Sequence, residues 1–220
     1  MITLGIDDAG RGPVIGPMIL AGCLIDDETE KEFRKLGIKD SKQLTQKRRE
    51  VLAEKIKEKA ETFEVQIVSP AIIDKSVEKN DLNGLEAVVA ARIINKINKG
   101  YSKIKIVIDC PSVSITKWQD FLKTKVDNLS NLEISCEHKA DKNHISVAAA
   151  SILAKCTREK EMTKLKEIYG DEIGSGYCSD PLTCKFLGKH AHKYEDKGIF
   201  RKTWSTWKRI VSSSKQKRLV

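Results

Sequence analysis

Residues 2–25 read ITLGIDDAGRGPVIGPMILAGCLI, an apolar run, a glycine-rich turn and a second apolar run. The first run, Ile2–Asp7, predicts a short strand, and Val14–Ile25 predicts a second one. The segment Gly10-Arg11-Gly12-Pro13 lies between them and has turn chemistry, so we expect the two strands to pair as a hairpin. This stretch therefore starts a sheet and leaves two acids, Asp7 and Asp8, beside its turn.

The rest of the chain alternates between helix and strand patterns. Thr45 is a suitable N-cap for the first predicted helix, and the small residues Ser146–Ser151 would let the last one pack closely against a sheet. The hairpin followed by alternating elements favours an α/β protein with a mixed sheet. Helices are expected at residues 42–61, 82–97 and 145–169, and strands at residues 64–68, 104–108 and 132–136.

Composition limits the classes that remain. The chain has 220 residues, of which 40% are hydrophobic, so it can bury a core and is not globally disordered. The basic helical pattern from Pro181 onward suggests two parts, a catalytic domain at residues 1–180 and a C-terminal helical region at residues 181–220. A formal net charge of +9 favours a polyanionic partner, although solubility alone would also explain it.

Location is inferred from what the sequence lacks. There is no run of about 20 apolar residues to cross a membrane, and the first residues lack the basic and apolar regions of a signal peptide. We therefore expect a cytoplasmic protein that does not bind membranes. The six scattered cysteines are expected to be free thiols in that compartment.

Four acids stand at predicted element ends: Asp7, Asp8, Asp109 and Asp141. Sites in open α/β sheets form beyond strand ends, and carboxylates gathered there repel unless a cation holds them. Oxygen ligands select Mg²⁺ or Mn²⁺, and two such ions about 4 Å apart support phosphodiester cleavage. Asp7 and Asp8 can share such a site only if the strand ends between them, since neighbouring strand residues face opposite ways. The alternative is that these are ordinary surface acids, four among 31.

Two other patterns are weaker. The glycines of the turn resemble the start of a dinucleotide-binding fingerprint, but the third, Gly16, is one position late and no helix pattern follows. The residue types Cys178, Cys184, His190 and His192 suit zinc, but their spacing matches neither a short cysteine pair nor a short histidine pair.

Several segments in order resemble the signatures of ribonuclease HII, the type 2 ribonuclease H, and look most similar to archaeal members. The resemblance spans nearly the whole chain. The segments are Gly5–Pro13, Asp40–Leu44, His138–Asp141, Ala148–Lys155 and Gly174–Pro181, with Trp204 and Thr206 in a C-terminal tryptophan motif.

The resemblance implies a ribonuclease H-like fold, a mixed five-stranded sheet flanked by helices with a small C-terminal helical region. It implies two-metal cleavage, with Mn²⁺ or Mg²⁺, of RNA–DNA hybrids and of duplex DNA at single ribonucleotides, leaving 5′-phosphate and 3′-hydroxyl ends. Asp7, Asp8, Asp109 and Asp141 fall on the family's catalytic and metal-binding acids. The resemblance also implies substrate contacts: Gly10, Arg11 and Gly12 to the ribose 2′-hydroxyl, Tyr177 to a sugar, and Lys42 near phosphates.

Three departures leave alternatives open. The family usually has glutamate at Asp8, often proline at Cys178, and lysine at Ser205. Asp8 favours the alternative of a catalytically weak protein that binds RNA–DNA hybrids, and a DNA-cutting nuclease of the same broad fold, such as a junction resolvase, is a further one. We expect a monomer. The tail at residues 214–220 resembles a partial sliding-clamp-binding peptide, although a solvated basic tail is the simpler explanation.

Overall fold

The computed structural model describes residues 1–39 and 44–216, and only the backbone of residues 212–216. The chain forms two compact units, each discontinuous in sequence. The first unit comprises Met1–Ala9, Ile19–Gln66 and Asn83–Cys156, and the second comprises Gly10–Met18, Ile67–Leu82 and the described residues from Thr157 onward. A functional division after residue 180 stays a prediction. No helix within the described residues is long and apolar enough to cross a membrane.

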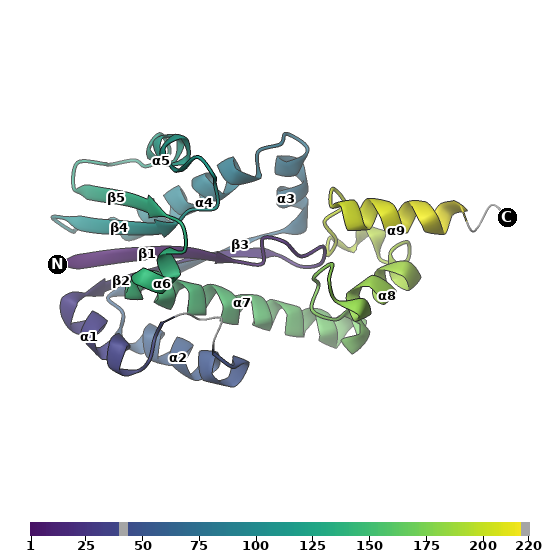
Figure 1. Cartoon of the computed structure of the whole chain (residues 1–220), viewed down its shortest axis with the longest axis horizontal. Coiled ribbons are helices and arrows are strands. Elements are labelled where there is room, and N and C mark those ends of the chain that lie inside the picture. Colours follow the sequence, from purple (N-terminus) through teal and green to yellow (C-terminus); the bar gives the residue numbers. More distant parts are fainter. Residues whose placement is uncertain (40–43, 217–220) are drawn as a thin grey trace. The chain divides into compact units, whose positions relative to one another are not determined.

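A five-stranded sheet with the order β3-β2-β1-β4-β5 forms the frame of the first unit (Figure 1). β1 pairs antiparallel with β2 and parallel with β4, and β4 pairs parallel with β5. The sheet is therefore mixed, which confirms the predicted fold class. The strands are β1 (Ile2–Ala9), β2 (Met18–Asp26), β3 (Thr62–Val68), β4 (Ile104–Asp109) and β5 (Leu132–Glu137).

Helices cover both faces of this sheet. Figure 1 shows α4 (Leu82–Ile97) and α5 (Ile115–Lys123) on one side, and α1 (Asp27–Lys35), α2 (Gln46–Lys59) and the beginning of α7 (Ile145–Tyr169) on the other. A continuous apolar cluster fills the layer beneath α1, α2 and α7, and it includes Ile19, Phe33, Leu52 and Ile152. Burying these side chains supplies most of the driving force for the arrangement.

A single glycine allows α7 to lie close to the sheet. A Cβ atom at Gly5, in β1, would stand 2.1 Å from the carbonyl carbon of Ser146. No other residue type fits there without moving the helix or the strand. The following residues Ala148–Ala150 are fully buried, so the predicted close approach of this small-residue segment is confirmed.

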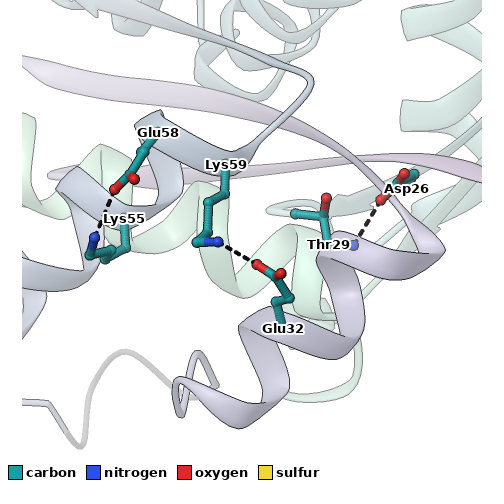
Figure 2. Close-up of polar contacts among 6 residues, drawn as sticks. All are labelled: Asp26, Thr29, Glu32, Lys55, Glu58 and Lys59. Carbon is teal, nitrogen blue, oxygen red and sulfur yellow. Dashed lines mark hydrogen bonds and ion pairs between the residues drawn. The ribbon is translucent and has the colours of Figure 1, made fainter.

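Polar contacts fix α1 and its neighbour α2 (Figure 2). Asp26 caps α1, and its Oδ1 accepts a hydrogen bond from the Thr29 amide at 2.8 Å. Lys59 of α2 lies 2.7 Å from Glu32 of α1. Because that ion pair is exposed, it contributes little to stability, whereas a cap that satisfies a main-chain amide contributes more. Thr45 caps α2 as predicted, by accepting from the Arg48 amide.

The second unit is mostly helical around its own apolar cluster. That cluster contains Val14, Ile15, Phe186, Phe200 and Trp207, and Ile15 pairs with Phe200 in an isolated bridge. The expected C-terminal helices are present. The elements of this unit are α3 (Pro70–Val77), the part of α7 after Cys156, the 3-10 helices η2 (Asp171–Ile173) and η3 (Glu195–Lys197), α8 (Pro181–His190) and α9 (Ser205–Gln216).

The structure corrects three sequence-based boundaries or omissions. β1 does not end at Asp7 but pairs with β2 as far as Ala9. β2 begins at Met18 and not at Val14, because the Val14 amide bonds to the carbonyl of Gly176 in the second unit. The helices α1, α3 and α5 were not predicted. α1 buries only Phe33, so it has no apolar repeat to detect.

Candidate active site

Two of the predicted acids follow the last residues that pair between the parallel strands β1 and β4. β1 and β4 are in register at Ile6 and Ile108, so Asp7 and Asp109 come next on each strand. The Ala140 amide donates to Asp109 Oδ1 at 3.1 Å. The short helix α6 (Ala140–Asn143) is therefore hydrogen-bonded to the Asp109 carboxylate through its first residue. The second residue of α6 is Asp141, which is 3% exposed.

Residue alternation along β1 places its two acids on opposite faces of the sheet. Asp7 lies on the same face as Gly5, which contacts α7, and Ser151 of α7 forms a hydrogen bond to the Asp7 carboxylate. Asp8 lies instead on the α4 face. Ladder pairing to β2 continues through both acids, so the expected condition for a shared site, a strand that ends between them, is not met. The two acids nevertheless line one cavity.

Asp7 is buried among other acids. Only 6% of its surface is exposed. Burial, together with the charges of Asp8 and Asp109, raises the pKa of Asp7 to about 8, although the Ser151 hydrogen bond acts in the opposite direction. A carboxyl group in such surroundings needs either a proton or a nearby cation at neutral pH. An all-oxygen donor set of this kind suits Mg²⁺ or Mn²⁺.

A narrow cavity of about 10 Å³ lies at this end of the sheet, and Asp7, Asp8 and Asp109 line it together with Glu86 of α4. The cavity has room for about one water molecule, and Asp141 is not among its lining residues. Among residues 1–39 and 44–216, no three acidic, histidine or cysteine side chains are gathered closely enough to hold a metal ion. The donors fit a cation by their chemistry, and binding one requires them to draw together.

Glu86 was not predicted as a site residue. It is 2% exposed, and a carboxylate buried that deeply usually has a partner or a function. The available signal was that Glu86 is the only acid in the apolar helical stretch of residues 82–97. Ser151, the partner of Asp7, gave no sequence signal beyond its small size.

The second unit holds the turn and the aromatic residue that the sequence singled out. Gly10 has a φ of +79°, and a Cβ atom there would stand 2.4 Å from Arg158 Cδ. The same Arg158 places its guanidinium 4.8 Å from the centre of the Tyr177 ring and donates to the carbonyl of Ser175 at 3.0 Å. Tyr177 is 40% exposed. Arg158, which the sequence did not indicate, thus contacts both predicted substrate-binding elements.

Two further predictions are not part of this arrangement. Lys42 lies outside the described residues. The four residues weighed as zinc ligands form other contacts: Cys184 Sγ lies 3.2 Å from the carbonyl oxygen of Cys178, and His190 lies 3.1 Å from Glu172. In the described part of the chain they do not come together as a metal site.

Comparisons with known proteins found a matching family and similar structures. The family model described as ribonuclease HII matches residues 4–207. A ribonuclease HII from Methanocaldococcus jannaschii is 41% identical over 230 residues, which cover 100% of this chain and 99% of the relative. The crystal structure of ribonuclease H2 from Pyrococcus horikoshii superposes with a TM-score of 0.88 at 36% identity, covering 98% of this chain and 100% of that one. A structure of the PCNA:RNase HII complex from Archaeoglobus fulgidus gives 0.81 at 38% identity, with 93% and 96% covered.

Proposed function

Because the chain belongs to the ribonuclease HII family, and is thus a metal-dependent endoribonuclease acting on RNA–DNA hybrids, we propose that it also cuts duplex DNA at single ribonucleotides. The proposed products carry 5′-phosphate and 3′-hydroxyl ends. Two divalent cations, Mn²⁺ or Mg²⁺, are proposed as cofactors, with Asp7, Asp8, Asp109 and Asp141 as their ligands.

The observation that carries the proposal is the surroundings of Asp7. Its carboxyl group is buried beside Asp8 and Asp109, and these charges raise its pKa. The arrangement is costly for the protein alone and becomes favourable when a cation binds, because the metal compensates the repulsion. Acids that served only as surface charges would lie apart and exposed.

We propose a role for each of these protein groups. When bound, divalent cations would activate a water molecule and stabilise the leaving 3′-oxygen. Asp7 and Asp109 each follow the last residue that pairs between the parallel strands β1 and β4, and the Ala140 amide donates a hydrogen bond to Asp109. Asp141, the residue after Ala140 in α6, is proposed as the fourth ligand.

Recognition of ribose is proposed for the second unit. The 2′-hydroxyl distinguishes RNA from DNA at a given nucleotide. Gly12 has open space around the place where a side chain would stand, so a nucleotide can approach the main chain of the Gly10–Gly12 turn. The exposed Tyr177 ring is available to pack against a sugar. Lys42 is retained as a proposed phosphate contact on the resemblance alone.

The experiment uses a DNA duplex with one ribonucleotide and Mn²⁺ or Mg²⁺. We expect a nick whose 3′-end is extended by a DNA polymerase and whose 5′-end is joined by a ligase without prior phosphorylation. Asp109→Asn should abolish cleavage while the Kd for the duplex is kept, since it removes the charge and keeps the shape. A variant with more than about a tenth of the wild-type rate, a barrier change under ~1.4 kcal/mol, would exclude Asp109 as a ligand. Binding by the wild type without cleavage in either metal would favour the hybrid-binding alternative.

A sliding clamp is proposed as a second partner. A ribonuclease HII from Archaeoglobus fulgidus has a solved complex with PCNA. In this chain the candidate segment is the tail at residues 214–220, of which residues 217–220 lie outside the described part. Deleting residues 214–220 should weaken clamp binding, measured by calorimetry. Unchanged affinity would exclude the tail as the contact.

A further inference from the structure

We infer that Arg201 is the positioning residue of the Gly10–Gly12 turn and sets how strongly the enzyme discriminates ribose from other sugars. The inference rests on the proposed role of this turn in contacting the 2′-hydroxyl. Arg201 is fully buried in the second unit. It lies about 190 residues from the turn in sequence, so the contact is made only in the folded chain.

The guanidinium of Arg201 binds the main chain of the turn. Its Nη1 donates to the carbonyl of Arg11 and its Nη2 to that of Gly10, each at 2.6 Å. Nη2 and Nε also donate to the carbonyl of Gly16, at 3.0 and 3.1 Å. The rigid, planar fork of arginine matches several acceptors at once, which the ammonium of lysine cannot do. Arg201 therefore fixes the carbonyl groups of Gly10 and Arg11 within the turn and that of Gly16 after it.

Trp204 completes the contact. Its Nε1 donates to the carbonyl of Gly12 at 2.9 Å, and the Arg201 guanidinium lies 5.1 Å from the centre of the tryptophan ring. The carbonyl groups of all three turn residues are thus bound by these two side chains. Such an arrangement leaves the peptide planes little freedom, because rotating any plane would break a hydrogen bond to the buried guanidinium of Arg201 or to the indole N–H of Trp204.

The orientation of the carbonyl groups determines where the amides point. The peptide bonds of the turn are trans, and in a trans peptide the N–H points opposite to the C=O. With the carbonyls of Gly10 and Arg11 directed to Arg201, the amides of Arg11 and Gly12 point to the other side. The next residue, Pro13, has no N–H. The turn therefore presents two amides in one direction, suited to donate to a hydroxyl oxygen.

Preorganised donors are what sugar discrimination requires. A site built to hydrogen-bond a substrate hydroxyl rejects analogues that lack it far more strongly than an apolar site could. That advantage depends on the donors being fixed before the substrate binds. Removing hydrogen bonds between Arg201 and the turn should therefore reduce discrimination at the 2′-position more than it reduces affinity for duplex DNA.

The test compares Arg201→Lys with the wild type on two duplexes that differ at one nucleotide, ribo or 2′-deoxy-2′-fluoro. Single-turnover rates are measured for both, with the Kd for an all-DNA duplex of the same sequence. We expect the ribo-to-fluoro rate ratio to fall at least about tenfold, while the Kd for all-DNA duplex changes less than about twofold. The metal concentration for half-maximal rate should stay unchanged.

Asp74→Asn is the matched control. Asp74 accepts hydrogen bonds from the amides of Lys202 and Thr203, at 2.8 and 3.1 Å, so the variant loosens the same segment without touching the turn. It should leave the ratio unchanged. If both variants lower the two rates in parallel, Arg201 acts only on stability and the inference is wrong.

Two outcomes separate this inference from the proposed function. If the wild type cuts both duplexes equally, the turn does not recognise the 2′-position, and the proposed function fails first. If Arg201→Lys is unfolded by circular dichroism, Trp204→Phe carries the test, since it keeps an aromatic ring and removes only the hydrogen bond to Gly12. A rate ratio unchanged in a folded Trp204→Phe variant would then overturn the inference.

Discussion

Asp8 has one methylene group fewer than the glutamate that ribonuclease HII sequences usually carry, so its carboxylate can sit back by up to ~1.5 Å. Mg²⁺ demands metal–oxygen distances of about 2.0–2.1 Å and near-octahedral geometry, whereas Mn²⁺ binds such ligands at least as well. We therefore predict a preference for Mn²⁺, and a rise in the Mg²⁺-to-Mn²⁺ rate ratio in Asp8→Glu. Cleavage rates at saturating concentrations of each metal measure it.

A ratio that stays the same or falls in Asp8→Glu would show that the protein already compensates for the shorter side chain. Asp8→Asn serves as the companion variant. If it is as active as the wild type in both metals, Asp8 is not a ligand at all.

The raised pKa of Asp7 predicts how stability depends on pH without metal. Between its ordinary value of 3.8 and about 8, the folded protein holds a proton that the unfolded chain has lost. The free energy of unfolding therefore falls as pH rises through this window. Asp7→Asn removes the titration, so it should be more stable than the wild type at pH 8 and similar at pH 4, in the presence of EDTA.

Thermal unfolding measures this prediction. For a chain of this size each kcal/mol shifts Tm by about 2–4 °C, so a difference of several degrees at pH 8 is expected. Asp27→Asn is the control for the removal of an exposed carboxylate. Added Mn²⁺ should stabilise the wild type more than Asp7→Asn. The quantity to compare is the Tm of Asp7→Asn minus that of the wild type. If this difference is smaller at pH 8 than at pH 4, the prediction is wrong.

At the scale of elements, the sequence predicted those that carry an apolar repeat. α4 and α7 have the bounds expected from their periodicity. The end of β1 was missed because its apolar run stops before the acids Asp7 and Asp8, whereas ladder pairing to β2 continues to Ala9. Tertiary contacts, which a single sequence does not display, decided that boundary.

The candidate site could also be predicted only in part. Asp7 and Asp109 could be found because each stands near a predicted strand end, and both line the cavity. Arg158 and Arg201 could not be found in this way. The chain contains 40 lysine and arginine residues, and nothing in the sequence indicates which of them are buried. Their importance comes from contacts with the turn, which form only on folding.

Asp26 tests the contribution of a single helix cap. Hydrogen bonds from the Thr29 amide lower the pKa of Asp26 below its ordinary value, so the cap stabilises the fold above about pH 4 and is lost as pH falls through the lowered pKa. Asp26→Ala should cost about 1 kcal/mol at pH 7 and less at pH 3. Urea unfolding at both pH values measures the difference. A cost that is equal at both would show that the charged carboxylate is not what caps α1.

At the scale of the whole molecule, the residues proposed for chemistry and those proposed for recognition belong to different units. All four predicted acids lie in the first unit, whereas the Gly10–Gly12 turn, Tyr177 and Arg201 lie in the second. The segment Gly10–Met18 follows β1 directly in sequence, and yet its residues Val14 and Ile15 pack into the core of the second unit. Substitutions in the second unit should therefore change the choice of substrate and leave the metal dependence of the rate unaltered.

Tyr177 gives the sharpest test of that separation. Aromatic stacking on nucleic acid is worth ~1–3 kcal/mol, and a lone ribonucleotide offers the enzyme one binding register whereas a long hybrid offers many. Tyr177→Ala should therefore slow cleavage at a single ribonucleotide by about five- to 150-fold and slow cleavage of a long hybrid less. Tyr177→Phe keeps the ring over Arg158 and should behave almost as the wild type. Equal slowing of Tyr177→Ala on both substrates, or a changed metal requirement, would mean that Tyr177 acts on the catalytic step and not on substrate position.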